Sequence, residues 1–357
     1  MLEHMLHHKP LWLVLPSDPD ASIAVSSRIR LARNLADLPF PQRCSSEQLR
    51  SVIDRVFAAA DTTTFLHNAD SYLLEELSSV ERQLLVERHL VSPEFISSDQ
   101  PAAVLISRDE TCSLMINEED HLRLQVLSPG MQLNEAWTVI DQLDTELEQL
   151  LPYAYSTRYG YLTVCPTNVG TGMRASIMLH LPALVHEHKI GSVMSAVGKI
   201  GIAVRGMYGE HSAARGNFFQ LSNQITLGRS EQEIVHQLHH VVSSIIDHER
   251  KLRQSFLSAA PHKARNAVGR AYGTLKYAEI LKSDEATDLL STLLMGIDLN
   301  AFSTVDRSTI SELLLDIQPA HLQKLCGKDL SSEERDVERA RIIRARLQKQ
   351  EDQESKP

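Results

Sequence analysis

Five arginines occupy the faces of predicted strands instead of exposed helices. Arg28, Arg30, Arg123, Arg174 and Arg205 come from four separate segments of a predicted sheet. A cation on a strand face costs desolvation free energy unless an anion lies opposite it. Several converging guanidinium groups suit a polyphosphate, because each forms bidentate and permanently charged hydrogen bonds. For any one of these arginines alone, pairing with a nearby carboxylate on a solvated face is the simpler interpretation.

A loop with paired glycines lies between two predicted strands, at residues 161–165 and 174–181. It reads Cys165-Pro166-Thr167-Asn168-Val169-Gly170-Thr171-Gly172. Proline and paired glycines allow a tight loop whose backbone N–H groups approach a ligand closely. Such a short pattern is weak evidence by itself. Cys165 is a candidate for a reactive or substrate-contacting thiol, although buried cysteines are commoner than functional ones.

Carboxylates accompany two of the arginines. Glu118, Glu119 and Asp120 crowd a predicted hairpin turn just before Arg123, and Arg205 is followed by a glycine-flanked loop that carries Glu210. A solvated acidic turn is the more frequent explanation. The alternative is that one carboxylate points inward as a general base or as a clamp for a cation.

Standard nucleotide motifs and metal motifs are missing. The sequence has no GxxxxGK[ST], no GxGxxG after a strand and no HRD–DFG pair. Two histidine clusters have spacings that a metal could use, and they are His4, His7 and His8, and His236, His239 and His240. We interpret them as surface histidines with metal binding as a minority option, and we predict no metal-ligating residue.

The hydrophobic pattern predicts the elements that position these residues. Ser26, Arg28 and Arg30 alternate with Val25, Ile29 and Leu31, as expected for a strand with two different faces. Further strands are predicted at 112–116, 121–127, 174–181 and 218–227. Short turns between consecutive strands favour an antiparallel sheet.

Helices are predicted on either side of these strands and throughout the C-terminal part. Ser230 to Glu233 forms a capping box before a helix, and further helices are expected at 259–282, 285–295, 308–317 and 331–350. The fold class is therefore α+β, an antiparallel sheet flanked by helices and followed by an all-helical domain. We expect an N-terminal extension (1–21), an α+β domain (22–253), a helical domain (254–350) and a polar tail (351–357).

Composition excludes several classes of function. The 357 residues carry a net charge of −10, which disfavours binding to nucleic acid or to an anionic membrane. The four cysteines are scattered without a CxxC pair, which fits a reducing cytoplasm. The apolar run at 11–15 is too short for a signal peptide or a membrane span.

Five ordered motifs together resemble the catalytic domain of the ATP:guanidino phosphotransferase (phosphagen kinase) family over about residues 22–253. They are the segments 26–30, 117–123, 165–171, 174–176 and 205–210. Within the family the resemblance is closest to the bacterial protein-arginine kinases. Only about 25 residues precede Ser26, which leaves no room for the helical N-terminal domain of the small-guanidine kinases. Arg335 to Ala340 also matches an RDxxRA motif that binds phosphoarginine allosterically in those bacterial enzymes; a charged helix face with an apolar stripe (Val337, Ala340, Ile343, Leu347) is the alternative.

The resemblance implies a role for each matching residue. Glu119 and Glu210 hold the substrate guanidinium, with Glu119 accepting its proton, while Cys165 contacts the guanidinium as a thiolate. Together, the arginines hold the ATP phosphates and neutralise charge in the transition state of phosphoryl transfer with the help of Mg²⁺, and they are Arg28, Arg30, Arg123, Arg174 and Arg205. The implied nucleotide-site residues are Ser26, Ser27, Arg28, Ile29, Arg30, His89, Arg123, Arg174, Ala175, Ser176, Ile177, Met178, Arg205, Gly206, Met207, Tyr208, Gly209 and Glu210. The implied phosphoarginine-site residues are Arg335, Asp336, Arg339 and Ala340.

The function implied by the resemblance is transfer of the ATP γ-phosphate to arginine side chains of proteins, which marks them for Clp-type degradation and relieves heat-shock repression. Implied partners are protein substrates, an activator of the McsA type, a repressor of the CtsR type, a Clp ATPase and a second copy of the chain. A small-molecule guanidino (arginine) kinase is the alternative. An inactive phosphoarginine-binding adaptor is disfavoured, since the arginines, both glutamates and Cys165 are all present.

Overall fold

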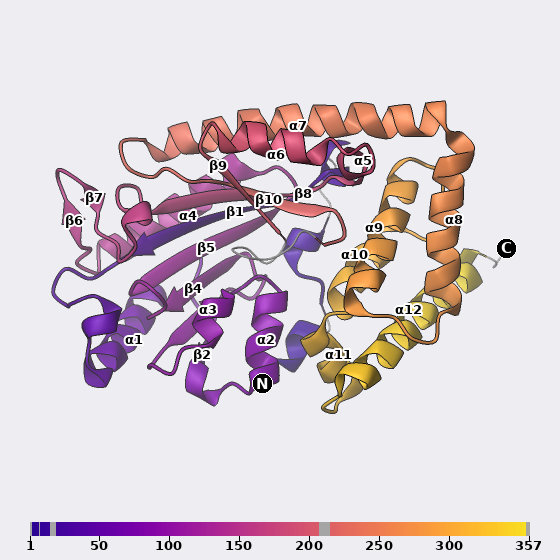
Figure 1. The fold of residues 1–357 in the computed structure, drawn as a ribbon. Helices are drawn as coiled ribbons and strands as arrows, with labels where there is room; N and C mark the ends of the chain where they lie inside the picture. The colour runs from indigo at the N-terminus through magenta and orange to yellow at the C-terminus, as the bar shows by residue number, and fades with distance from the viewer. Residues whose placement is uncertain (1, 7, 15–18, 207–214, 355–357) are drawn as a thin grey trace.

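An eight-stranded sheet occupies the part of the chain before residue 224 (Figure 1). The computed structural model describes residues 2–6, 8–14, 19–206 and 215–354. The strands follow the spatial order β2-β3-β4-β5-β1-β8-β10-β9, and every neighbouring pair is antiparallel, as predicted. Their bounds are β1 Ala24–Arg33, β2 Asp70–Leu73, β3 Ala103–Ile106, β4 Cys112–Ile116, β5 Leu122–Pro129, β8 Met173–His180, β9 Ile202–Arg205 and β10 Phe218–Asn223.

Helices surround the sheet and then form the C-terminal part of the chain. The first group is α1 Ser46–Ala60, α2 Ser79–Glu87, α3 Pro93–Ile96, α4 Leu133–Glu148, α5 Pro182–His186 and α6 Ile190–Gly198. The second is α7 Glu231–Ala259, α8 Pro261–Tyr277, α9 Ser283–Asp298, α10 Arg307–Asp316, α11 Pro319–Cys326 and α12 Ser332–Glu354. The fold is thus α+β with a helical C-terminal region. Along the described residues, no helix is both long and apolar enough to cross a lipid bilayer.

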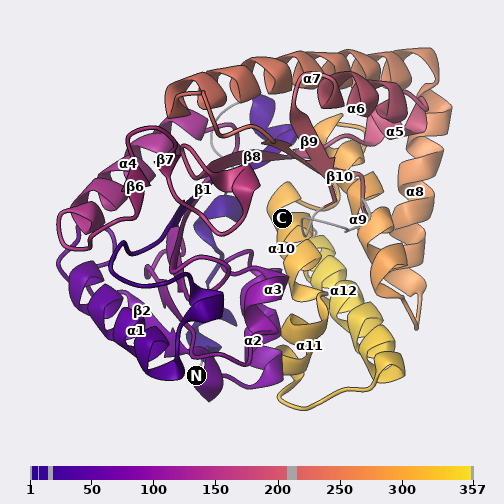
Figure 2. The ribbon, with the colours of Figure 1, turned by 60° about the vertical axis from the view of Figure 1, so that its left-hand side comes forward.

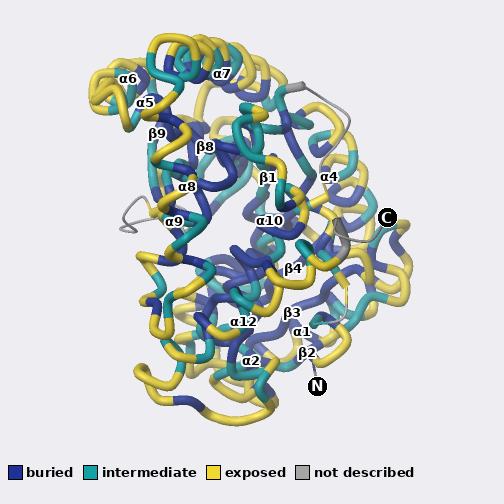
Figure 3. The backbone as a smooth tube through the Cα atoms, turned by 90° about the vertical axis from the view of Figure 1, so that its right-hand side faces the viewer, coloured by how far each residue is buried: buried dark blue, intermediate teal, exposed yellow. Residues whose placement is uncertain are grey.

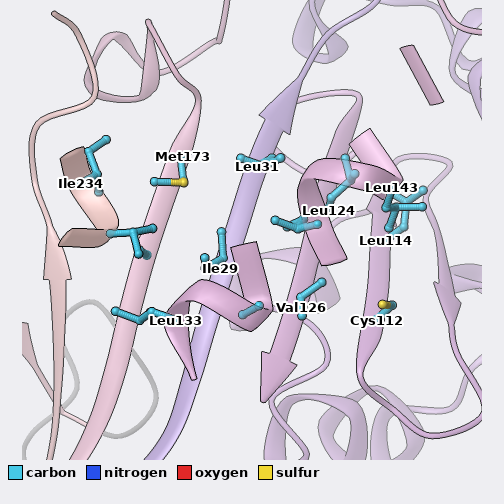
Figure 4. Packing of buried hydrophobic residues seen from close by; sticks show 14 of the residues in the cluster. Ile29, Leu31, Cys112, Leu114, Leu124, Val126, Leu133, Leu143, Met173 and Ile234 are labelled. Carbon is cyan, nitrogen blue, oxygen red and sulfur yellow. The ribbon is translucent and has the colours of Figure 1, made fainter. Parts of the chain in front are cut away.

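One face of the sheet carries the main hydrophobic core (Figure 4). Ile29 and Leu31 of β1 point into it together with Leu124 of β5 and Met173 of β8, and helices α1, α4 and α7 cover it. Successive strand residues point to opposite faces, so the arginines at positions 28 and 30 must point away from this core.

The opposite face is covered by helices at its two ends, and the short segment Leu11–Leu13 also contacts β1 and β5. At the β3–β4 end, α2 and α3 pack on Val104, Ile106 and Met115, while at the other end the C-terminal helices pack on Met178 and Phe218. Figure 3 shows the strands as mostly buried between these layers. The polar middle of this face is where the active-site residues gather.

A β-bulge alters the predicted face of one residue. The register between β1 and β8 shifts between Ala24 and Ser26. Val25 therefore packs with Met178 and Phe218 under the C-terminal helices, and the prediction that it shares a face with Ile29 and Leu31 is wrong. A bulge inserts one extra residue and reverses the facing of what precedes it.

The C-terminal helices return to the first half of the molecule. Helix α7 runs without interruption past residue 253, so the predicted domain boundary lies inside one helix (Figure 1). Helix α11, which periodicity did not predict because it has only eight residues, packs beside α2 (Figure 2). Glu87 of α2 accepts hydrogen bonds from the backbone N–H groups of Ala320 (2.8 Å) and His321 (3.1 Å) at the α11 N-terminus.

Two predicted strands are shorter than expected. The strand predicted at 161–165 is wrong beyond Tyr161, because only β7 (Gly160–Tyr161) pairs, with β6 (Tyr155–Ser156). The following backbone bonds to side chains instead: Leu162 O accepts from Asn34 Nδ2 (3.1 Å) and Val164 N donates to Asp120 Oδ1 (2.8 Å). The strand predicted at 218–227 ends at Asn223.

Candidate active site

A single cavity of about 940 Å³ collects the five strand arginines. Strand β1 lies at the centre of this arrangement, since Arg30 is the register partner of Arg174 on β8 and of Gln125 on β5. The other predicted site residues on the cavity wall are His89, Glu119 and Cys165. Side chains that are up to 177 residues apart in the sequence, from Arg28 to Arg205, therefore meet in one place.

Arg28 and Arg30 create an excess of positive charge in this cavity. Burial, together with the charges of Arg174, Arg205 and Arg123, lowers the pKa of Arg28 to about 10. Burial and the neighbouring arginines also lower the pKa of Arg30 well below its ordinary value. Arg28 donates to Gln220 Oε1 at 2.7 Å, but within the described ranges no carboxylate lies within 4.0 Å of either guanidinium. A bound polyanion would neutralise this excess of positive charge.

The three carboxylates of the acidic turn have three different environments. Glu118 pairs with Arg123 at 3.0 Å and accepts from Ser92 Oγ at 2.6 Å. Asp120 is fully buried and accepts from Asn34 and from the backbone of Val164. Glu119 pairs with Arg123 at 3.1 Å, yet 39% of its side chain stays exposed, on the cavity wall. The solvated-turn interpretation is therefore wrong for two of the three.

Glu119 has the environment of a proton acceptor. Burial raises the pKa of its carboxyl, the charges of Asp120 and Glu118 add to the rise, and Arg123 opposes it. Burial lowers the pKa of Arg123, but the three carboxylates outweigh this and raise it above its ordinary value. Arg123 thus keeps its charge while linking the acidic turn to the arginine cluster.

The Cys165 loop is fixed by a close backbone approach. Gly170 has φ +112°, and a Cβ there would lie 2.5 Å from the carbonyl oxygen of Thr226. The Thr226 hydroxyl donates to Thr167 O (2.8 Å) and Val169 O (2.7 Å). Cys165 itself begins a 3₁₀ turn, and its Sγ lies 3.0 Å from Thr167 Oγ1. Gly170 thus permits a backbone approach that a side chain would prevent, in the same loop from which Cys165 lines the cavity.

His89 follows helix α2 in a left-handed conformation with φ +61°. Burial and the charge of Arg28 lower the pKa of its imidazole to about 3, so the ring is neutral at physiological pH. Gln125 Nε2 donates to the His89 carbonyl (2.8 Å), and Trp12 packs edge-on at 5.0 Å. A neutral aromatic ring beside the arginines suits contact with a flat ligand.

The remaining predicted nucleotide-site residues fall into three groups. Ser26 and Met178 line a smaller apolar cavity of about 40 Å³ that shares His89 with the first cavity. Residues whose side chains point to the other face of the sheet are Ser27, Ile29, Ala175 and Ile177, so only their backbone faces the site. Ser176 lies on the same face as Arg174, and Gly206 directly follows β9. The predicted Met207, Tyr208, Gly209 and Glu210 lie outside the described residues.

Several cavity residues were missed by the sequence analysis, among them Gln42, Ser92, Gln125 and Gln224. Gln125 could have been predicted from the sequence, because it lies two positions after Arg123 on the same strand and therefore on the same face. The others come from irregular segments or helix ends, and no local pattern marks them. Only the hydrogen bond from Ser92 to Glu118 in the structure identifies Ser92 as a residue of the site.

The RDxxRA segment lies on α12, apart from this cavity. Arg339 is buried and donates to the carbonyl oxygens of Ile317 (3.0 Å) and Leu281 (2.8 Å) and to Asp336 (2.5 Å). Arg335 is half-buried and donates to Leu330 O at 2.8 Å. Val337 is 45% exposed and does not belong to the predicted apolar stripe, whose other members Ala340, Ile343 and Leu347 are buried.

Comparison with known proteins agrees with both halves of this architecture. Residues 51–252 match the ATP:guanido phosphotransferase C-terminal catalytic domain, and residues 261–357 match the protein-arginine kinase McsB C-terminal domain. A protein-arginine kinase of Moorella thermoacetica is 48% identical over 334 residues, which are 93% of this chain and 95% of that protein. A protein-arginine kinase of Halothermothrix orenii is 46% identical over 92% of this chain and 94% of the other.

Solved structures show the same fold. A lombricine kinase superposes with a TM-score of 0.58 and 26% identity over 68% of this chain and 73% of that chain. The duplicated taurocyamine kinase of Schistosoma mansoni, solved with transition-state analogue components, gives a TM-score of 0.60 and 24% identity. That match covers 73% of this chain and 39% of the duplicated one.

Proposed function

The chain belongs to the ATP:guanido phosphotransferase family, and we propose that it is a protein-arginine kinase, which transfers the γ-phosphoryl group of ATP to arginine side chains of proteins. The main observation behind the proposal is that one cavity contains both a cluster of arginines and a carboxylate. Among the residues that the structure describes, no carboxylate lies within 4.0 Å of the Arg28 or Arg30 guanidinium, and Glu119 presents a carboxylate on the same cavity wall.

The arginine cluster would hold the triphosphate. Arg28 and Arg30 would bind its oxygens directly, while Arg123, Arg174 and Arg205 would neutralise the charge that spreads over the transferring phosphoryl group. These side chains are fixed by strands β1, β5, β8 and β9, so they need little reorganisation during the reaction. Neutral His89 would contact the rest of the nucleotide without adding charge.

Mg²⁺ fits this site as an ion carried by the nucleotide. Among the described residues no group of three or more His, Cys, Asp or Glu side chains could hold a metal by itself. Mg²⁺ is commonly bound by one or two carboxylates together with substrate phosphates and water, and Glu118 supplies a carboxylate beside the arginines. The ion would supply further neutralisation of phosphate charge.

Glu119 would act on the acceptor. A guanidinium is a delocalised cation with a pKa above 12 and is poorly nucleophilic. Glu119 can accept a hydrogen bond from one nitrogen, localise the positive charge away from the attacking nitrogen and take its proton as the P–N bond forms. Cys165 on the facing loop would contact the same group, and Glu210 would complete the grip, as the family resemblance implies.

A second ligand site would lie on α12. Arg335 and Asp336 face outward enough to bind phosphoarginine, whereas Arg339 and Ala340 would shape the site from within, because both are buried. Occupancy of this site would regulate the kinase. Helix α11 lies between α12 and α2, which supports a path to His89.

In the cell, we propose that this activity marks misfolded and regulatory proteins, including a heat-shock repressor, for Clp-type degradation in the cytoplasm. An activator protein and a second copy of the chain would assist it. These roles rest on the resemblance to bacterial protein-arginine kinases, which the 48% identity supports.

The decisive experiment offers an unfolded protein and free arginine to the enzyme separately with Mg·ATP. We expect phosphoarginine on the protein, detected by mass spectrometry without acid because the P–N bond is acid-labile. Turnover of free arginine alone would reject the proposal in favour of a small-molecule guanidino kinase, the activity named for the structural relatives.

A further inference from the structure

Three large apolar side chains are half-exposed beside the mouth of the active-site cavity. Ile200, Ile225 and Leu227 have exposed fractions of 50%, 50% and 52%, and we call them the apolar rim. They are neighbours in space: Gln224 N donates to Gly201 O (3.0 Å), and a Cβ on Gly201 would lie 3.3 Å from Ile225 Cδ1. The rim is therefore built from two adjoining segments, 200–201 and 225–227, of which the second also borders Gly170 of the Cys165 loop.

The rim is fixed to the loop that carries Cys165. Thr226 turns its hydroxyl inward to Thr167 O and Val169 O, which directs the residues on either side of it outward. Thr171 N also donates to Thr226 O at 3.3 Å. The apolar side chains are thus held at a defined place, and their exposure is not the result of a loose segment.

The rim is continuous with the cavity wall. Gln224, which directly precedes Ile225, lines the cavity, and so does Thr167, to which Thr226 is bonded. An arginine side chain is one unbranched tether between the guanidinium and the backbone. When the guanidinium reaches Glu119 and Cys165, the peptide backbone must remain at the mouth, beside the apolar rim.

We propose that the apolar rim binds apolar side chains next to the target arginine in an unfolded segment of the substrate; this inference rests on the proposed protein-arginine kinase function. In an extended peptide successive side chains alternate in direction, so residues beside the arginine are free to contact the rim while the arginine enters the cavity. Exposed apolar clusters mark sites of protein interaction. Apolar neighbours of an arginine are accessible in unfolded chains and buried in most folded ones, so the rim favours unfolded substrates.

The test compares two peptides that each contain one arginine, flanked in one by Leu and Val and in the other by Ser and Gly. We expect wild-type kcat/KM, measured as phosphoarginine by mass spectrometry, to favour the apolar peptide by about fivefold to tenfold, as partial burial of one or two apolar side chains predicts. The double variant Ile225→Ser/Leu227→Ser should lose this preference and keep its KM for ATP. Leu150→Ser is the matched control, because Leu150 is 53% exposed and does not line the cavity.

Each alternative outcome has one meaning. Equal wild-type rates for the two peptides, or a preference that survives in the double variant, would overturn the inference and leave the proposed function intact. Phosphorylation of neither peptide nor an unfolded protein would instead reject the proposed function. A change in the mass of the assembly by sedimentation in the double variant, without a change in preference, would assign the rim to a second copy of the chain and also overturn the inference.

Discussion

Removing the charge of Glu119 and removing that of its neighbour Glu118 should have different effects on activity and stability. Glu119→Gln keeps the size of the side chain but removes the proton acceptor. General-base catalysis contributes about 10²–10⁴-fold to a rate, so kcat should fall by about that factor. Arg123 retains Glu118 at 3.0 Å, so the arginine cluster stays in place and the KM for ATP should change little. Because 39% of the Glu119 side chain is exposed, the free energy of unfolding should fall by less than about 1 kcal/mol.

Glu118→Gln is the matched control with the opposite expectation. Glu118 is 6% exposed and holds both Arg123 and Ser92. Loss of a charge-assisted hydrogen bond there costs about 1.5–3 kcal/mol of stability, and the displaced Arg123 should raise the KM for ATP. Initial rates of phosphoarginine formation on an unfolded protein, together with urea unfolding, measure both effects. Glu119→Gln with kcat within a factor of ten of wild type would refute its role as base.

Four further predictions follow from the same geometry. Because burial raises the pKa of Glu119, the acid-side decline of kcat/KM should have its midpoint at a pH above the ordinary glutamate pKa of about 4.3. The residual activity of Glu119→Gln should not show this acid-side decline in a pH profile. Arg30→Met should abolish stabilisation by tripolyphosphate in a thermal melt and yet raise the melting temperature of the ligand-free protein, because it removes a charge that burial and the neighbouring arginines destabilise; a lower melting temperature would contradict this. Arg339→Met should lower the free energy of unfolding by about 2–4 kcal/mol, because it strands two buried carbonyls, whereas Arg335→Ala should weaken phosphoarginine binding in calorimetry without that loss. Gly170→Ala should cost about 1–3 kcal/mol in urea unfolding and slow turnover, since its Cβ would strike Thr226 O, and unchanged turnover would show that the Cys165 loop need not be fixed.

Sequence periodicity predicted the sheet because one of its faces is mostly apolar. The alternation is clear around Ile29 and Leu31 of β1, whereas Ser27 and Arg33 are polar residues on the same face and a bulge turns Val25 to the opposite face. Local pattern also failed at residues 162–165, where the backbone bonds to the distant side chains Asn34 and Asp120. Helix α11 was missed because eight residues are too few for a clear helical period, and its N-terminus is stabilised by Glu87, more than 230 residues earlier.

The sequence predicted the site residues that lie on strands, because alternation along a strand shows which face each side chain occupies. Arg28, Arg30 and Arg123 were recognised because their positions in the alternation place them opposite the core. The division of labour in the acidic turn was not predictable, because it depends on which partner each carboxylate finds. Ser92 and Asn34 supply those partners, and both lie in segments without a regular pattern.

Strand β1 carries three arginines, and their counter-ions separate structure from function. Arg33 points to the core face, where Asp144 of α4 receives it in a buried ion pair at 2.6 Å, and the pKa of Arg33 is raised because this pairing outweighs the cost of burial. Arg28 and Arg30 point to the other face, and their pKa values are lowered by burial and by the charges of the neighbouring arginines, which outweigh the opposing charge of Glu118 at Arg30. The same residue type in one strand thus stabilises the fold at one position and strains it electrostatically at two others. Among residues 2–206 and 215–354, as far as the structure describes them, neither Arg28 nor Arg30 has a carboxylate within 4.0 Å as Arg33 does, so these two charges are the ones that a negatively charged ligand would stabilise.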